Sequence, residues 1–164
     1  QRQMCIRDRT RPMRDGETDG VEYYFTTPEV LQRFSEEGKM IELRTYETVS
    51  GPWSYATVDD GQVDLENEDY LAIGTLISYE NMRNYYGEDH VIPLYIAVDD
   101  GVRLERALRR ERQQKKPNYA ELCRRFLADE ADFSRENLQR LGIEKAYENE
   151  DFEECVLQLK NTIV

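Results

Sequence analysis

The sequence has few cysteines and a single histidine, and both shortages exclude kinds of site. Cys5, Cys123 and Cys155 lie far apart and form no Cys-x-x-Cys pair, which argues against a zinc site and against a disulfide framework. Unpaired thiols suit a reducing cytosol, so we expect a cytoplasmic protein. A lone histidine, His90, excludes a histidine-rich metal site and disfavours a Ser-His-Asp triad. We interpret His90 as an ordinary residue at the start of a strand.

The sequence also lacks long apolar runs, and its basic residues are outnumbered by acidic ones. No stretch approaches the length of a membrane span, and no apolar segment near the start has the form of a signal peptide. The formal net charge of −12 argues against general nucleic-acid binding. A small anionic ligand needs only a local positive pocket, and the arginines gather in two places: Arg11 with Arg14, and residues 103–125. The 164 residues fit one domain with a real core and room for a small inserted subdomain.

The most informative run is 10–25, TRPMRDGETDGVEYYF. Arg11 and Arg14 are two cations three positions apart, divided by Pro12, which limits backbone freedom. An aromatic strand follows at Tyr23. A guanidinium donates two parallel hydrogen bonds and stays charged, so two of them on a stiff loop, followed by a tyrosine hydroxyl, predict a clamp for a terminal phosphate. A charged turn before a hairpin is the alternative, and spacing alone does not choose between the two.

This run resembles the signature with which guanylate kinases hold GMP, and the similarity continues more loosely to the C-terminus. The resemblance implies an α/β fold of the P-loop NTPase type, in which helices flank a parallel sheet. It also implies an inserted antiparallel β lobe that binds GMP, at about 20–68, and a helical lid with its flanking helices, at about 104–126, both within a domain at 10–164. The implied reaction transfers the γ-phosphate of ATP to GMP, with Mg²⁺ bridging the ATP phosphates. GMP and ATP would be the partners of a monomer or homodimer that contacts neither nucleic acid nor membrane.

Two features depart from that family. Residues 1–9 do not match the strand end and hydroxyl residues expected before Thr10, and QMCIRDR reads as translated adaptor sequence, so we interpret 1–9 as a non-native leader without function. No Gly-x-x-x-x-Gly-Lys-Ser/Thr loop is present, because Met40 follows the only Gly-Lys pair, Gly38-Lys39. We therefore expect an inactive fragment without the first strand, P-loop and helix, prone to aggregate through an open sheet edge.

Periodicity predicts a hairpin followed by alternating strands and helices, the pattern of a parallel sheet covered by helices. The first predicted elements are a helix from Pro28 to Gly38, strands 40–46 and 53–58, a helix at 59–67, a buried strand at 70–73 and a helix from Ser78. They are followed by a strand at 91–98, a helix capped by Asp99 or Asp100, a helix at 119–131, a strand at 145–148, and a final helix with Phe152, Cys155, Val156, Leu159 and Ile163 on one stripe.

Glu42 stands between two apolar residues of a predicted strand. One carboxylate can accept both the N1–H and the N2–H₂ of guanine, and it would repel adenine, which presents an acceptor at N1. The resemblance implies that Glu42 binds the base and that Thr57 contacts guanine O6. It also implies the residues on the GMP phosphate: Arg11, Arg14, Tyr23 and Tyr55. The alternatives are that Glu42 faces solvent on an alternating strand and that the tyrosines are ordinary strand residues.

Three arginines of the second basic region resemble those that the family brings onto the transferring phosphoryl group: Arg106, Arg110 and Arg125. Arg106 and Arg110 lie one helical turn apart, and a lid at 113–118 separates them from Arg125. The alternative is a solvated basic helix with acidic neighbours. Asn149 resembles an adenine-side residue of the ATP site.

One further departure concerns the end of the strand at 70–73. The family has acidic residues there, whereas this chain has Gly74-Thr75-Leu76. A domain of this kind without catalysis could serve as a peptide-binding scaffold, and that is the alternative function.

Overall fold

The computed structural model describes residues 2–4, 7–13, 16–21, 23–48 and 51–163. The predicted phosphate ligand Arg14 lies outside the described residues. The chain divides into two compact units, residues 1–91 and 92–164, and each is described by itself.

The first unit is built around a four-stranded sheet with the strand order β3-β2-β5-β4. Its strands are β2 (Arg7–Arg9), β3 (Tyr23–Phe25), β4 (Met40–Thr48) and β5 (Gly51–Val58). β4 and β5 are antiparallel, as predicted, and each is slightly longer than the alternation of the sequence indicated. β2 pairs antiparallel with β5 and parallel with β3. Residues 7–9 thus form a strand of this sheet, whereas the non-native origin of residues 1–9 stays a prediction.

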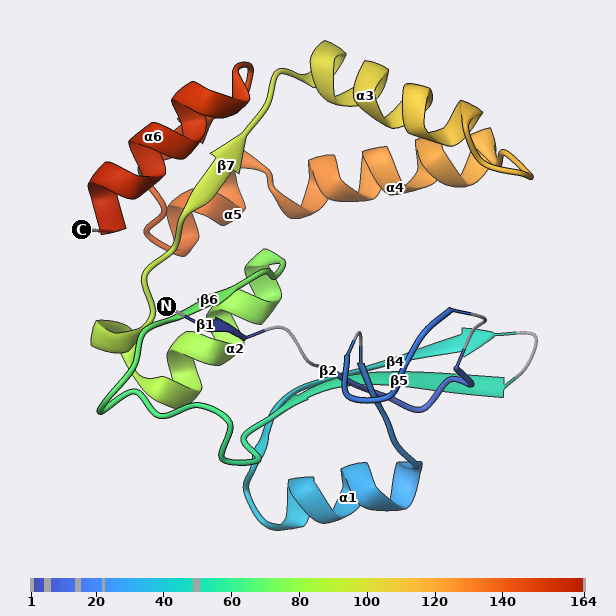
Figure 1. The fold of residues 1–164 in the computed structure, drawn as a ribbon, viewed down its shortest axis with the longest axis vertical. Helices are drawn as coiled ribbons and strands as arrows, with labels where there is room; N and C mark the ends of the chain where they lie inside the picture. Colours follow the sequence, from blue (N-terminus) through green and yellow to red (C-terminus); the bar gives the residue numbers. More distant parts are fainter. Residues whose placement is uncertain (1, 5–6, 14–15, 22, 49–50, 164) are drawn as a thin grey trace. The chain divides into compact units, whose positions relative to one another are not determined.

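Helix α1 (Pro28–Glu36) follows the aromatic strand, where the Thr27-Pro28-Glu29 start signal predicted it. It lies along one side of the β4–β5 hairpin (Figure 1), and Leu31 from the helix is buried, as are Ile41 and Ala56 from the hairpin. Gly38 ends the helix with a φ of +71°, a conformation that residues with a Cβ adopt only with strain.

The predicted helix at 59–67 does not form. Aspartate side chains there accept hydrogen bonds from nearby backbone amides instead: Asp59 from Gly61, and Asp64 from Glu66. Short acidic side chains compete in this way with helical hydrogen bonding, and the segment is a series of turns.

Strand β6 (Tyr70–Ala72) pairs parallel with β1 (Arg2–Met4). It was predicted to be buried, but Leu71 is 42% exposed and Ile73 is 79% exposed. The physical reason is that β1 is its single partner among the described strands. Helix α2 (Leu76–Tyr86) begins two residues before the predicted Ser78, because Thr75 is its N-cap. His90 belongs to the short 3₁₀ helix η1 (Glu88–His90).

The second unit contains one parallel strand pair and four helices among its described residues. β7 (Tyr95–Ala97) pairs with β8 (Ala146–Glu148). The helices are α3 (Asp100–Arg112), α4 (Tyr119–Asp132), α5 (Arg135–Arg140) and α6 (Phe152–Ile163). α3 and α4 run side by side (Figure 1). Asp99, one of the two predicted caps, is the N-cap of α3, whereas α5 was not predicted.

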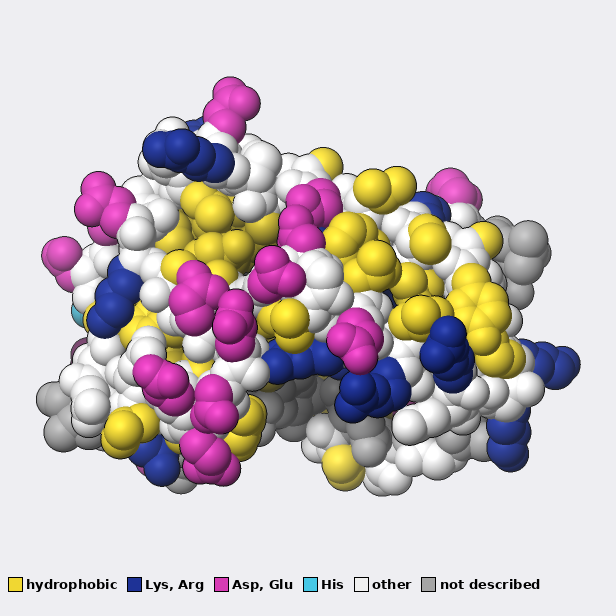
Figure 2. Space-filling model, turned by 90° about the horizontal axis from the view of Figure 1, so that it is seen from above, with side chains coloured by type: hydrophobic (Ala, Val, Ile, Leu, Met, Phe, Trp, Pro, Cys, Tyr) yellow, Lys and Arg dark blue, Asp and Glu magenta, His cyan; other side chains and the backbone are white. Residues whose placement is uncertain are grey.

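The fold is mixed α/β, with parallel pairing in both units. The described pairings join β1 with β6 and the four strands of the larger sheet in the first unit, and β7 with β8 in the second. In the described part of the chain, no helix combines the length and apolar character needed to cross a membrane. Figure 2 shows acidic, basic and apolar side chains intermingled on the face that it draws.

Candidate functional site

One face of the four-stranded sheet collects the residues predicted to bind GMP. In antiparallel strands, directly opposed residues project to the same face. Glu42 lies opposite Thr57, and both Arg44 and Arg9 lie opposite Tyr55. Because residues two apart in a strand also share a face, all five side chains belong to one side of the sheet.

Glu42 and Thr57 are each buried, with 7% of the residue exposed. The Oε1 atom of Glu42 and the Oγ1 atom of Thr57 have no hydrogen-bond partner. Arg44 Nε lies 2.6 Å from Glu42 Oε1, so the two form an ion pair whose direction does not meet the geometry of a hydrogen bond. A buried polar atom left without a hydrogen bond costs about 1–3 kcal/mol. Two such atoms on neighbouring strands indicate a place where a ligand can supply the missing partners.

Arg44 also links this face to helix α2. Its Nη2 donates to Thr75 Oγ1 at 2.7 Å, and Thr75 Oγ1 accepts from the backbone N–H of Ser78 at 3.4 Å as the helix cap. The segment Gly74-Thr75-Leu76, where the family pattern has acidic residues, thus provides a helix cap and an acceptor for Arg44.

Arg11 is almost fully buried and is paired with Glu17. Its Nη1 donates to Glu17 Oε2 and to the carbonyl of Pro12, each at 2.8 Å, and its Nη2 donates to Glu17 Oε1. These bonds to the Glu17 carboxylate raise the pKa of Arg11. The Nε–H of Arg11 is buried without a hydrogen-bond partner, so one donor of the guanidinium is unused while the two Nη groups bond to Glu17.

The tyrosines predicted to bind phosphate lie beside this pair. The guanidinium carbon of Arg11 is 5.8 Å from the centre of the Tyr23 ring, and the Tyr55 side chain contributes to the raised pKa of Arg11. The guanidinium carbon of Arg9 is 3.1 Å from the Tyr23 ring centre and 4.6 Å from that of Tyr55. The structure therefore brings Arg11, Tyr23 and Tyr55 together around Arg9.

Arg9, Glu17 and Arg44 were missed by the sequence reasoning. Arg9 had been set aside with residues 1–9, although the alternation of Arg9 and Arg11 in an extended segment would have placed both on one face. Glu42 and Arg44 are also two positions apart in a strand, which would have placed them on one face. Glu17 carried no local signal, because it reaches Arg11 only after the turn at Gly16, whose φ is +88°.

The arginines predicted to act on the phosphoryl group all belong to the second unit. Arg106 Nη1 donates to the backbone carbonyl of Asn149 at 2.8 Å, and its Nη2 donates to that of Glu150 at 2.9 Å. These bonds tie α3 to the segment that precedes α6. The backbone of Asn149 is also held by Ala97, through an N–H···O bond of 2.8 Å. A role for the Asn149 side chain toward adenine stays a prediction.

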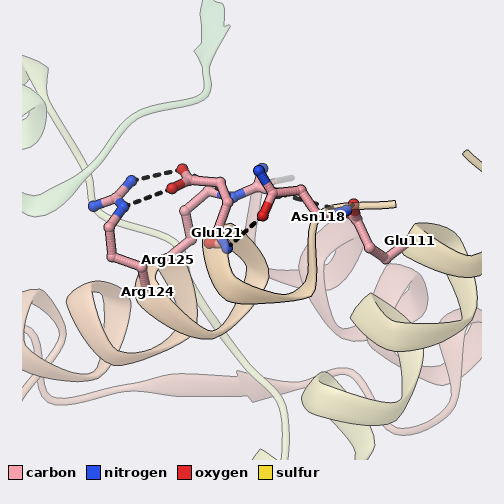
Figure 3. A network of polar contacts seen from close by, with 5 residues as sticks. All are labelled: Glu111, Asn118, Glu121, Arg124 and Arg125. Carbon is pink, nitrogen blue, oxygen red and sulfur yellow. Dashed lines mark hydrogen bonds and ion pairs between the residues drawn. The ribbon is translucent and has the colours of Figure 1, made fainter. Parts of the chain in front are cut away.

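Arg125 belongs to a polar network at the start of α4, which Figure 3 shows. Its side chain is 58% exposed and lies 3.7 Å from Glu121 and 3.9 Å from Glu111. Glu111 also accepts the backbone N–H of Asn118 at 2.6 Å, which ties the two ends of the predicted lid segment together. Arg110 is exposed, and the described residues include no ion-pair partner for it.

The predicted base and phosphate ligands thus share the first unit, and the predicted transfer arginines share the second. Their joint action on one phosphoryl group stays a prediction. Among the described residues, no group of three or more His, Cys, Asp or Glu side chains could hold a metal ion. Mg²⁺ bound mainly through nucleotide phosphates and water would need few ligands from the chain.

Comparison with known proteins decides the family. The family model described as guanylate kinase matches residues 1–164. The chain belongs to the guanylate kinase family. It is 58% identical over 33 residues to a guanylate kinase of Syntrophotalea carbinolica, a match that covers 20% of this chain and 16% of that protein. It is 43% identical over 56 residues to a guanylate kinase of Streptococcus agalactiae, covering 32% of this chain and 27% of that protein.

The crystal structure of guanylate kinase from Anaplasma phagocytophilum has a similar fold. The TM-score is 0.57 at 22% sequence identity, over 97% of this chain and 72% of that one. This likeness supports the mixed α/β fold of the guanylate kinase family. The matches to the curated relatives span well under a third of their lengths.

Proposed function

We propose that the first unit binds GMP and that the chain is the acceptor-binding part of a guanylate kinase, which transfers the γ-phosphate of ATP to GMP to give GDP. The observation that carries the proposal is the pair formed by Glu42 and Thr57. They lie opposite each other on neighbouring strands, both are buried, and each has a polar atom without a hydrogen-bond partner.

Guanine supplies what this pair lacks. Its N1–H and N2–H₂ would donate to the Glu42 carboxylate, and the Thr57 hydroxyl would donate to O6. Adenine presents an acceptor at N1 and no amine at C2, so both bonds to Glu42 would be lost, and the Thr57 hydroxyl would have to accept from the C6 amine instead of donating to O6. Arg44, whose Nε lies 2.6 Å from Glu42 Oε1, would hold the carboxylate in place for both bonds.

The other end of the nucleotide would lie at the group of Arg11, Tyr23 and Tyr55. Charge-assisted hydrogen bonds from a guanidinium and hydroxyl donors from tyrosine are suited to a phosphate dianion. Arg14, which lies outside the described residues, would add a second cation. The strand register supports this arrangement, because Tyr55 and Thr57 project from β5 to the same face.

Transfer itself needs no protein nucleophile. An oxygen of the GMP phosphate attacks the γ-phosphorus of ATP, and ADP leaves with the electrons of the broken P–O bond. Arg106, Arg110 and Arg125 are the residues proposed to stabilise the charge that spreads over the phosphoryl oxygens. Of the three, Arg110 is exposed and has no ion pair among the described residues.

Calorimetric titration of the chain with GMP and AMP tests the proposal. We expect GMP to bind more tightly than AMP, and Glu42→Gln to weaken GMP binding about 100-fold, because the amide replaces one acceptor by a donor and removes the charge. Glu47→Gln is the matched control, an exposed glutamate on the same strand β4. Equal affinity for GMP and AMP, or an unaltered affinity in Glu42→Gln, would contradict the proposal.

The alternative, a non-catalytic scaffold, is favoured by one observation. Arg106 is bound to two backbone carbonyls in the structure, a structural use that requires no nucleotide. A phosphopeptide in the same titration distinguishes the two. Binding of the phosphopeptide, with no response to GMP, would favour the scaffold.

A further inference from the structure

Arg9 stands out among the cations of the first unit because its charge is not balanced locally. Arg11, its neighbour two residues on, is neutralised by a buried ion pair with Glu17. Arg9 forms no such pair with any carboxylate in the described part of the chain, and its Nε is buried without a hydrogen-bond partner. Burial lowers the pKa of Arg9 and the charge of Arg11 lowers it further, whereas Tyr23, Tyr55 and Glu17 act in the opposite direction. Two neighbouring guanidiniums with one carboxylate leave room for an anion.

The guanidinium of Arg9 is held between two aromatic rings. Its central carbon is 3.1 Å from the Tyr23 ring centre and 4.6 Å from the Tyr55 ring centre. Stacking of this kind uses the flat faces of the guanidinium. Its N–H groups lie in the plane of the group, so stacking does not use them, and Nε is buried without a hydrogen-bond partner.

The backbone around Arg9 is fixed on both sides. Its carbonyl accepts the N–H of Thr26 at 2.9 Å. The next residue, Thr10, bonds to Ser54 twice, through its own N–H at 3.0 Å and through its hydroxyl, which accepts the Ser54 N–H at 2.8 Å. A side chain on such a strand keeps a defined direction, which favours recognition over a mobile surface cation.

From these observations we propose that Arg9 binds the acceptor phosphate, as a further cation held between Tyr23 and Tyr55. The proposal rests on the proposed function for the identity of the ligand as GMP. It adds a residue that neither the sequence motif nor the family resemblance assigns, since the motif begins at Thr10. The chemistry recognised is a phosphate monoester dianion, and Arg9 would distinguish nucleoside monophosphate from nucleoside.

The test compares the chain with Arg9→Gln and Arg9→Lys for binding of GMP, guanosine and inorganic phosphate, by calorimetry and ³¹P NMR. We expect Arg9→Gln to weaken GMP and phosphate about 10-fold to 100-fold, the range for a charge-assisted hydrogen bond. Guanosine affinity should stay within about 2-fold, because the base contacts are untouched. Arg9→Lys, which keeps the charge and loses the planar fork, should lie between the chain and Arg9→Gln. Arg33→Gln, an exposed arginine of α1, controls for net charge.

The outcomes separate this proposal from the proposed function. GMP and phosphate affinities unchanged in Arg9→Gln would overturn the role of Arg9 while leaving guanine recognition intact. Equal losses for guanosine and GMP would also overturn it, since a structural role moves both ligands together. If phosphate binding depends on Arg9 while GMP is not preferred to AMP, the role of Arg9 holds and the guanine assignment fails. Should Arg9→Gln fail to fold, Arg9→Lys gives the decisive comparison: a GMP-to-guanosine affinity ratio equal to that of the original chain overturns the proposal.

Discussion

The two units of the chain handle their charged residues in opposite ways. In the first unit, Glu42, Arg11 and Asp8 are buried in or beside a sheet, at 7%, 2% and 5% exposure, and each has a side-chain atom without a hydrogen-bond partner. In the second unit, most paired charges lie on helix surfaces with partners three or four residues away, as Glu105 with Arg109 does, while Arg103 with Glu130 and Arg125 with Glu111 join α3 to α4. Helix spacing supplies such partners automatically. A sheet brings together residues far apart in sequence and leaves their polar atoms for a ligand.

The difference should be largest when a buried pair is broken. Glu17→Gln leaves the guanidinium of Arg11 buried without a carboxylate, and we expect a loss of about 2–3 kcal/mol in the free energy of unfolding. Urea denaturation followed by the fluorescence of Trp53 measures it, because this is the only tryptophan and it lies in β5 of the first unit. A change below about 0.5 kcal/mol would show that the pair is not buried in solution.

An effect of intermediate size on the free energy of unfolding is expected from Asp8, and it depends on pH. Burial, with help from the charge of Asp60, raises the pKa of Asp8 from 3.8 to about 6. Because the folded pKa exceeds the unfolded one, the folded state binds the proton more tightly, and stability is lost as pH rises through about 4 to 6. Between pH 5 and 8 the chain should lose about 1 kcal/mol from this group.

Asp8→Asn removes this dependence, so its unfolding free energy should fall less over the same pH range. Asp69→Asn, an exposed aspartate of the same unit, should leave the pH profile as it is. Parallel profiles for the chain and Asp8→Asn would contradict the raised pKa.

The smallest effect is expected in the network of Figure 3. Glu121 accepts two hydrogen bonds from Arg124, at 2.8 and 2.7 Å, yet both side chains are largely exposed. Exposed ion pairs of this kind often contribute nothing measurable, so Glu121→Gln should leave the helix melting followed by circular dichroism unchanged. If Glu121→Gln lowered the free energy of unfolding as much as Glu17→Gln, the contrast between the two units would be contradicted.

Local signals predicted most of the elements, and the errors have identifiable causes. The helix start at Thr27-Pro28 depends on neighbouring residues alone and is confirmed, although the Thr27 hydroxyl makes no capping hydrogen bond. Of the two caps predicted for α3, Asp99 and Asp100, the structure has Asp99. The helix at 59–67 was wrong because its aspartates bond to adjacent amides. The buried strand at 70–73 was wrong because burial depends on neighbouring strands, which an apolar run does not specify.

The same division holds for the candidate site. The motif around Arg11 and the lone carboxylate Glu42 were visible in the chain, and the family to which they pointed is confirmed. The sequence did not predict that Glu17 pairs with Arg11, and it did not predict that Arg9 stacks on two tyrosines. Both depend on turns and strand pairing between segments distant in the sequence.

By itself, the sequence determined the family, the hairpin, the helix starts and the residue types of the proposed nucleotide site, because each depends on side-chain chemistry and short-range spacing. Only the tertiary structure decided which cations were already neutralised and which polar atoms were left without a partner. Burial and hydrogen bonding are properties of the assembled strands, and pairing β2 with β5 placed Arg9 beside Tyr55 although 46 positions separate them in the chain.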